Sequence, residues 1–206
     1  MTVQILDCMQ RSVEWFEARR GLVTASEFST VMASGRGGGE SKTRRTYMLK
    51  LAGEIVSGDP MSTFESADMI RGREMEAEAR NLYQLVNDAE LTQVGFIVNG
   101  RRGCSPDSLI GDKGGLEIKT AAPHILIDLI LKDEFPPEHK AQVQGSLMVA
   151  EREWWDLLVY WPKMPPFTKR AYRDEPYIAE MSKAIDAFNA ELDEVVQRVK
   201  RYGAAN

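Results

Sequence analysis

The stretch Gly103–Thr120, GCSPDSLIGDKGGLEIKT, predicts the centre of the fold because it has the pattern of a β-hairpin. The runs from Gly103 to Ile110 and from Gly115 to Thr120 contain the apolar and β-branched residues typical of strands. The segment Gly111-Asp112-Lys113-Gly114-Gly115 between them is rich in residues that form tight turns. We therefore expect two antiparallel strands that bring polar side chains from separate positions together.

Three charged residues of this hairpin are expected to lie close together. Asp107 ends the triplet Ser-Pro-Asp, and Glu117 follows ten residues later, so the two carboxylates fall nearly opposite each other across the turn. Strand alternation places Lys119 on the face of Glu117 and directs Ile118 to the other face, towards the core. The pattern therefore predicts two converging carboxylates beside an ammonium group.

Two adjacent carboxylates repel unless a proton or a cation lies between them, and hard oxygen ligands favour magnesium or manganese over zinc. A metal held by Asp107 and Glu117, with the Ile118 carbonyl as a further ligand, would activate a water molecule and bind a phosphate oxygen. Lys119 would orient or deprotonate that water and offset charge on the phosphorus. A second interpretation stays open, in which Asp107 is a turn residue and Glu117 and Lys119 form a solvated ion pair.

Two helical patterns add further polar candidates. Glu76, in the segment GREME, shares a helix face with Arg80, and it is either another metal ligand or a surface glutamate paired with that arginine. His139, Gln142 and Ser146 form a polar line at spacings of three and four residues. That line either faces a phosphate or water, or is the polar side of an ordinary amphipathic helix.

Composition limits the class of protein. Hydrophobic residues make up 43% and charged residues 28% of the 206 residues, which is typical of a folded globular chain and suits a single domain over residues 1–206. No run is apolar for the roughly 20 residues needed to span a bilayer, and no secretory signal is evident, so we expect a cytoplasmic protein. The two cysteines are too few for a disulfide framework or an iron–sulfur cluster, and we expect free thiols. The net charge of -5 requires any DNA contact to come from local basic patches and bound metal.

Periodicity, capping residues and prolines predict the remaining elements. Helices are expected over Ser12–Arg20, from Thr24 to near Gly35 with Thr24-Ala25-Ser26-Glu27 as a capping box, and over Ser62–Val86, Pro123–Leu131, Pro137–Ala150 and Pro176–Tyr202. Strands are expected over Leu91–Val98, Glu153–Trp161 and Thr168–Arg173, and a flexible basic loop over Ser34–Arg45. This order predicts a mixed α/β or α+β class.

Five segments, in this order, resemble the phage lambda-type exonuclease family of viral recombination nucleases, a branch of the PD-(D/E)xK superfamily. They are EWFEARRGLVTASEF (14–28), GREMEAEA (72–79), CSPDSL (104–109), GLEIKT (115–120) and HKAQVQ (139–144). The resemblance implies a restriction-endonuclease-like core, in which helices flank a central mixed β-sheet. It also implies a 5′-to-3′ exonuclease that degrades one strand of linear double-stranded DNA to mononucleotides and leaves a 3′ single strand for a single-strand-annealing recombination protein. A ring-shaped homotrimer is a further implication.

The resemblance also assigns roles to the charged hairpin. It implies that Glu76, Asp107, Glu117 and the Ile118 carbonyl hold two Mg²⁺ ions, for which Mn²⁺ is a substitute, and that Lys119 assists the nucleophilic water. Gln142 matches an active-site glutamine of the family. His139 stands where relatives can carry an aromatic residue, and its role stays open.

A preference for 5′-phosphorylated ends is a family trait, and it maps to Arg19, Ser26 and Ser105. The residues themselves fit this role, since Ser26 is expected in the first turn of a helix capped by Thr24, where free N–H groups attract an anion. Arg19 adds a planar cationic fork. The ordinary alternatives are that Ser26 only starts a helix and that Arg19 is a surface charge beside Trp15.

The resemblance reaches two further DNA-binding candidates. Met69 matches an apolar residue that wedges between the terminal bases, although packing in the core explains it equally well. Arg36, in the glycine-rich loop, matches an arginine that reaches DNA. Two rivals to the exonuclease interpretation stay open: another PD-(D/E)xK nuclease, such as a structure-specific endonuclease, and a non-catalytic DNA-binding clamp.

Overall fold

Two β-sheets form the framework of the computed structural model, which describes residues 2–35, 37, 39, 41–60 and 67–204, without the side chains of residues 67–69, 73, 203 and 204. The first sheet has the order β1 (Gln4–Leu6), β4 (Phe96–Asn99), β5 (Arg102–Cys104) and β2 (Val23–Thr24). The second has the order β3 (Leu91–Thr92), β6 (Ser108–Ile110), β7 (Gly114–Thr120), β8 (Trp154–Tyr160) and β9 (Phe167–Tyr172).

The expected hairpin is confirmed as β6 and β7. Ser108 pairs with Leu116, and the Asp107 N–H donates to the Leu116 carbonyl at 3.2 Å, so Asp107 follows in register beside Glu117. The second sheet is mixed, because β7 runs parallel to β8 while β3–β6, β6–β7 and β8–β9 are antiparallel pairs. This agrees with the expected mixed α/β class.

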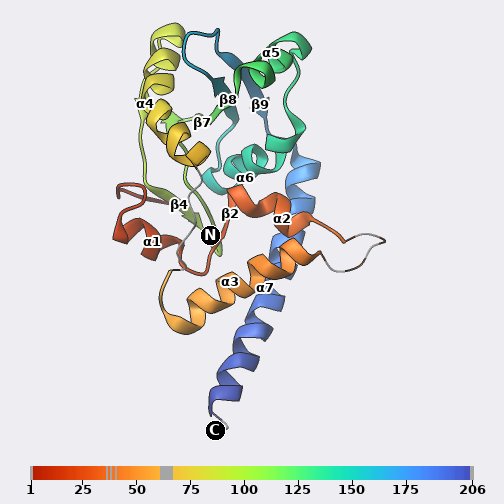
Figure 1. Cartoon of the computed structure of the whole chain (residues 1–206). Helices are drawn as coiled ribbons and strands as arrows, with labels where there is room; N and C mark the ends of the chain where they lie inside the picture. The colour runs from red at the N-terminus through yellow and green to blue at the C-terminus, as the bar shows by residue number, and fades with distance from the viewer. Residues whose placement is uncertain (1, 36, 38, 40, 61–66, 205–206) are drawn as a thin grey trace.

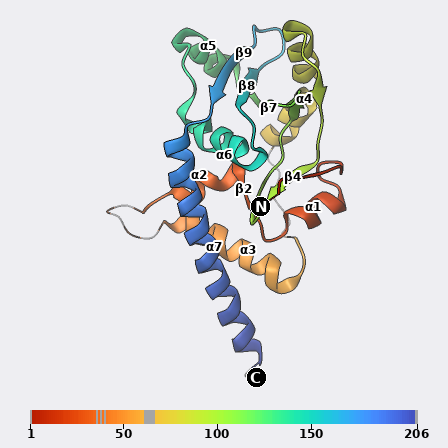
Figure 2. The ribbon, with the colours of Figure 1, turned by 180° about the vertical axis from the view of Figure 1, so that it is seen from behind.

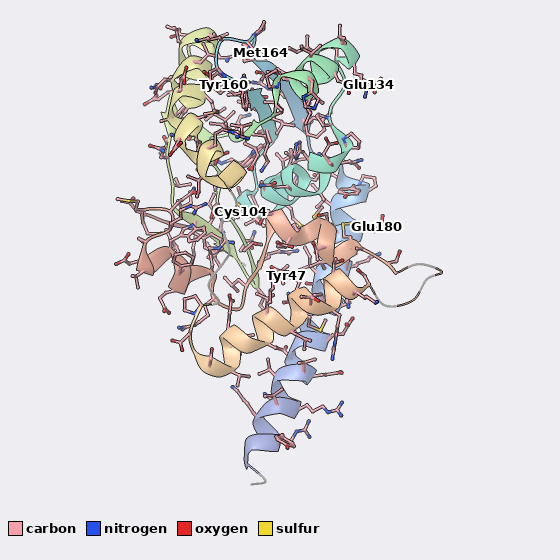
Figure 3. The ribbon with its side chains drawn as sticks, in the orientation of Figure 1. Tyr47, Cys104, Glu134, Tyr160, Met164 and Glu180 are labelled. Carbon is pink, nitrogen blue, oxygen red and sulfur yellow. The ribbon has the colours of Figure 1, made fainter. Side chains whose placement is uncertain are left out.

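Two of the expected strands are each divided between the two sheets. The run from Gly103 to Ile110 becomes β5 in one sheet and β6 in the other, because Pro106 has no N–H to donate to a ladder and the chain crosses there. The run Leu91–Val98 becomes β3 and β4, and between them Gly95 passes so close to Cys8 that an added Cβ would lie 2.1 Å from the Cys8 carbonyl oxygen. Figure 3 labels Cys104, which ends β5 in the middle of the molecule, directly before the crossing.

The helices follow the sequence pattern except before residue 58, and the expected helix start at Ser62 lies outside the described residues. They are α1 (Val13–Arg19), a 3₁₀ turn η1 (Ala25–Glu27), α2 (Phe28–Met32), α3 (Lys42–Ser57), α4 (Ala67–Asn87), α5 (Pro123–Lys132), a 3₁₀ turn η3 (Pro137–His139), α6 (Lys140–Ala150) and α7 (Glu175–Ala204). The serine Ser12 caps α1, as expected, by accepting the Trp15 N–H.

Two N-terminal expectations are wrong. Thr24 belongs to β2 and makes no side-chain cap, since its hydroxyl pairs with the Ser26 hydroxyl at 3.3 Å. The segment after it is a 3₁₀ turn and a short helix that ends at Met32. The basic loop ends earlier than expected, because Ser41 caps α3 by accepting the Arg44 N–H and a helix the sequence did not reveal begins at Lys42.

The helices enclose the sheets in layers that Figure 1 shows, with α4 on one side of β7 and β8 and α5 on the other side, near β9. Tyr83 of α4 packs with Leu116, Ile118 and Leu158, whereas Leu126 of α5 packs with Leu157, Val159 and Phe167. The helix α6 lies between this unit and the part that contains α2, α3 and α7 (Figures 1 and 2).

The apolar stripe of α7 faces the largest core cluster, as its three-and-four spacing predicts. Its fully buried members are Met181, Ile185, Phe188 and Leu192, while Val199 near the C-terminus is 47% exposed. Figure 2 shows that this end of α7 extends beyond α3. Among the described residues, no helix is both long and apolar enough to cross a membrane.

Candidate active site

Asp107 stands at the point where the chain crosses between the two sheets. Its side-chain Oδ2 accepts the N–H of Ile118 from the neighbouring strand, which fixes the carboxylate against β7. Burial raises the pKa of Asp107 well above its usual value, and the charges of Glu117 and Glu76 raise it further. The three carboxylates are therefore close enough to repel one another.

Glu117 is held from two sides by cationic and amide donors. Lys119 Nζ lies 2.8 Å from Glu117 Oε1, and Gln142 Nε2 on α6 donates to the same oxygen at 2.5 Å. The glutamate is only 5% exposed. Burial lowers the pKa of Lys119, but the carboxylates of Glu117, Asp107 and Glu76 outweigh it, so the pKa lies above its usual value and the amine is held as an ammonium ion.

Glu76 lies on α4, the helix that packs against β7 of the hairpin. The helix comes close to β7 at Gly72, where an added Cβ would lie 3.1 Å from the Thr120 hydroxyl. Arg80, one turn after Glu76 on the same helix, forms an ion pair with Glu76 and donates to the Ser108 hydroxyl at 3.2 Å. The pairing with Arg80 that the sequence offered as an alternative is thus present, and it lies inside the site rather than on a remote surface.

These side chains face a cleft of about 860 Å³. Its lining includes Glu76, Arg80, Asp107, the backbone position Ile118 and Lys119, together with residues from the segment before α1. Glu117 is not part of the lining and lies behind Lys119, next to Gln142. The structure thus brings Glu76, Asp107 and Ile118 of the predicted metal site to one cleft and places Glu117 behind its wall.

The donor set is the one that a hard divalent cation prefers. Among the described residues, no three His, Cys, Asp or Glu side chains are arranged as ligands of one metal. Glu76 is paired with Arg80, and Glu117 is paired with Lys119. Burial is the main cause of the raised Asp107 pKa, and the added repulsion from Glu117 and Glu76 is relieved by a cation as well as by a proton. Carboxylate and carbonyl oxygens around one cleft therefore fit magnesium.

A second, smaller cavity of about 160 Å³ unites the three residues predicted to bind a terminal phosphate. Arg19, Ser26 and Ser105 all line it, and Gln142 also contributes to its wall. Its volume is below the roughly 300–1,000 Å³ of pockets for drug-sized molecules, and it suits a small ionic group. The three residues that the family resemblance grouped thus lie around one cavity, although the helix start that was expected to support Ser26 is a 3₁₀ turn.

Arg19 is fixed in this small cavity by an aromatic neighbour. Its guanidinium carbon lies 4.0 Å from the centroid of the Trp15 ring, and Ser105 Oγ accepts from Trp15 Nε1 at 2.9 Å and from Arg19 Nη1 at 3.4 Å. Burial lowers the pKa of Arg19 from its usual value, so the cation is partly desolvated. A desolvated, oriented guanidinium is well suited to bind an anion in two-pronged geometry.

Three further predicted site residues are His139, which lines neither of the two cavities, Arg36 and Met69. Burial lowers the pKa of His139 and Lys119 lowers it further, which places this imidazole near the site as a mainly neutral group. Arg36 lies outside the described residues, as does the side chain of Met69. Sequence reasoning missed Gln10 and Arg11, which line both cavities, because the segment before α1 carries no periodic or motif signal.

A mixed five-stranded sheet with Glu117 and Lys119 on its central strand β7, and Asp107 directly before β6, defines a nuclease of the lambda-exonuclease-like PD-(D/E)xK type. The family model of the YqaJ-like viral recombinase domain matches residues 14–153. The chain therefore belongs to the YqaJ-like viral recombinase family, the group of viral-recombinase-type alkaline exonucleases.

Solved structures agree with this assignment. The alkaline exonuclease LHK-Exo from Laribacter hongkongensis is 33% identical with a TM-score of 0.84, and the alignment covers 94% of this chain and 99% of that one. A second structure of LHK-Exo, in complex with dAMP, gives a TM-score of 0.85 at the same identity and coverage. A phage-related exonuclease from Haemophilus somnus 129PT shares the fold at 14% identity, with a TM-score of 0.67 and coverage of 86% and 96%. No curated protein sequence matches the chain.

Proposed function

We propose that this chain is a magnesium-dependent exonuclease that degrades one strand of linear double-stranded DNA from its 5′ end and prefers a 5′-phosphate. The observation that carries the proposal is the adjacency of two cavities. The cleft with Glu76, Asp107 and Lys119 fits the chemistry of phosphodiester hydrolysis, and the small cavity with Arg19 and Ser105 fits a terminal phosphate.

The two cavities share Gln10 and Arg11 in their walls. A terminal phosphate bound in the small cavity would therefore lie next to a phosphodiester bound in the large cleft. Such spacing suits a strand end whose first phosphodiester is cut, releasing a mononucleotide. LHK-Exo, which shares the fold at 33% identity, has been solved with dAMP, a mononucleotide with a 5′-phosphate. Both observations support cleavage that begins at an end.

The residues divide the chemistry among them. Glu76, Asp107, Glu117 and the Ile118 carbonyl would hold two Mg²⁺ ions, which supply Lewis acidity and an acidified water when bound. Lys119, an ammonium ion beside Glu117, stabilises the negative charge that builds on the phosphorus and orients the attacking water. Gln142 holds the Glu117 carboxylate in place from behind.

The assembly and the partner are part of the same proposal. The family resemblance supports a ring-shaped homotrimer around the duplex, and the net charge of -5 is consistent with a basic channel inside acidic outer surfaces. The remaining 3′ single strand would pass to a single-strand-annealing recombination protein.

One experiment tests the proposal against its rivals. Linear duplexes with a 5′-phosphate or a 5′-hydroxyl, and a closed circular duplex, are incubated with magnesium or with a chelator. We expect mononucleotides from linear DNA, faster from the phosphorylated end, and no products with chelator. Cleavage of the circle would identify a structure-specific endonuclease, and inertness towards every substrate would identify a DNA-binding clamp.

A further inference from the structure

The short segment Asp7–Arg11, between β1 and α1, separates the two cavities of the site. Asp7, Cys8 and Met9 line only the large cleft, whereas Gln10 and Arg11 line both the cleft and the small phosphate cavity. Figures 1 and 2 show α1 and the chain before it beside β4 and below α4, the helix that carries Glu76. This segment thus forms the wall past which a DNA strand end would run.

Several contacts hold this wall in place. Gln10 Nε2 donates to the Val94 carbonyl at 3.2 Å and to the Pro106 carbonyl at 2.9 Å, which ties the segment to the crossing directly before Asp107. The Ser12 N–H donates to the Met9 carbonyl at 3.0 Å and closes a turn. The position of Arg11 is therefore fixed relative to the carboxylate cluster rather than set by a loose terminus.

Arg11 itself has an unusual backbone for a residue with a side chain. Its φ is +72°, in the left-handed region that favours glycine, and it is exposed. Non-glycine residues in this conformation are strained, and such strain is concentrated at functional sites. The cationic side chain of Arg11 thus starts from a hydrogen-bonded turn and belongs to a residue that lines both cavities.

Two guanidinium groups therefore converge on the small cavity. Arg11 and Arg19 both line it. Burial is the main cause that lowers the Arg19 pKa, and the positive charge of Arg11 lowers it further, by a smaller amount. Like charges brought together at a small cavity are stable when an anion lies between them. Glu76 and Asp107 line the large cleft on the other side of the wall. Their negative charges repel an anion there unless a metal cation is bound.

We propose that Arg11 is a specificity-determining residue that binds the 5′-terminal nucleotide between its two phosphates, sharing the terminal phosphate with Arg19 and contacting the phosphodiester to be cut. This inference rests on the proposed function, since it requires a 5′-terminal phosphate in the small cavity. Arg19 then recognises the end, and Arg11 sets the distance of one nucleotide between the end and the carboxylate cluster.

The test measures equilibrium binding of short duplexes with a 5′-phosphate or a 5′-hydroxyl, with calcium in place of magnesium and a check that the substrate stays intact. We compare the wild type with Arg11→Ala, Arg11→Lys, Arg19→Ala and the control Arg20→Ala. Arg20 is an exposed neighbour that lines neither cavity and instead donates to the Gly58 carbonyl. It thus controls for the loss of one positive charge.

We expect Arg11→Ala to weaken binding of the 5′-phosphorylated duplex by about 10-fold or more, with partial recovery in Arg11→Lys and little change in Arg20→Ala. The slope of log Kd against log salt should fall by about one in Arg11→Ala, because one phosphate contact is lost. A merely structural role for Arg11 would leave that slope unchanged.

A fourth variant separates binding from folding. Arg11→Gly removes the same side chain as Arg11→Ala but relieves the left-handed backbone, so it should melt about 2–4 °C higher than Arg11→Ala while DNA binding is lost equally in both variants. Wild-type binding by Arg11→Ala together with weakened binding by Arg19→Ala would overturn the inference and leave the proposed function intact. Equal binding of phosphate and hydroxyl ends by the wild type would overturn both.

Discussion

Gln142 Nε2 on α6 lies 2.5 Å from Glu117 Oε1 on β7, and this contact joins the helix to the strand that carries both Glu117 and Lys119. Lys119 Nζ lies 2.8 Å from the same oxygen. A single oxygen atom is therefore oriented by two donors from different elements, which restricts the glutamate to one position. Restricted carboxylates are what a metal-assisted hydrolase requires of its ligands.

Replacing Gln142 should affect activity more than folding. In Gln142→Ala, Glu117 keeps only the Lys119 donor, and we expect kcat to fall by about 10- to 100-fold, the usual cost of losing a supporting contact to a ligand. Gln142→Glu, which adds a like charge, should be slower still. Steady-state kinetics on phosphorylated linear duplex measures both.

A neighbouring glutamine provides the matched control. Gln144, buried on the same helix, donates to the Tyr172 carbonyl and accepts the Asp174 N–H. Gln144→Ala should therefore lower the free energy of unfolding by about 1–3 kcal/mol, because buried partners lose their hydrogen bonds, and should change kcat little in the folded fraction. If Gln142→Ala instead destabilises the fold as much and leaves kcat unaltered, our reading of the 142–117 contact is wrong.

Lys119→Ala should slow hydrolysis strongly but spare DNA binding. The ammonium group stands at the cleft, and loss of such a stabilising charge costs about 10²–10³-fold in kcat. Single-turnover kinetics and a binding assay on the same duplex separate the two effects. Lys132→Ala, which removes an exposed lysine paired with Asp128, is the control and should digest DNA at the wild-type rate. Wild-type digestion by Lys119→Ala would remove this residue from the catalytic site.

The carboxylate Asp156 should be among the most important polar residues for stability. It is 3% exposed on β8, accepts the Tyr83 hydroxyl from α4 and is paired with Arg170 through Nε at 2.8 Å and Nη2 at 2.9 Å. Asp156→Ala should cost about 3 kcal/mol, since it strips a buried network of its acceptor. Urea denaturation measures this loss.

The matching control for that network is an exposed ion pair. Asp128 pairs with Lys132 on the surface of α5 at 2.6 Å. Asp128→Ala should change the free energy of unfolding by less than about 1 kcal/mol, because exposed pairs contribute little. Equal effects of the two substitutions would show that the Asp156 network does not anchor α4 to β8.

Stability should decline in alkaline solution because of a buried phenol. Burial raises the pKa of Tyr47 to about 12, whereas the unfolded chain titrates this group near its ordinary value of about 10. The contribution is therefore fully present below pH 10 and is lost as the pH rises from about 10 to 12, by on the order of 1 kcal/mol at pH 11.

Melting temperatures recorded between pH 8 and 11 test this prediction. Tyr47→Phe should lower the melting temperature at pH 8, because the Thr24 N–H loses its acceptor, but should flatten the alkaline decline. Tyr202→Phe, at an exposed position near the C-terminus, should leave both unchanged. An equally steep decline in Tyr47→Phe would assign the alkaline sensitivity to other groups.

The sequence by itself determined the β6–β7 hairpin, and with it the meeting of Asp107, Glu117 and Lys119. This was possible because strand alternation and a glycine-rich turn fix neighbours over a distance of about ten residues. The α7 stripe was equally legible, since spacing alone identifies the buried face of a long helix. Local periodicity thus accounts for most elements and for the core of the site.

Only the tertiary structure decided which separate segments meet. Two predicted strands, which contain Pro106 and Gly95, are each divided between the two sheets, and the strand with which each half pairs depends on distant parts of the chain. The same folding carries the segment that contains Gln10 and Arg11, some 100 residues before Asp107, into the wall between the two cavities. Long-range packing leaves no periodic trace in a chain, so the sequence predicted the residues of the phosphate cavity only by resemblance and gave no sign of its wall.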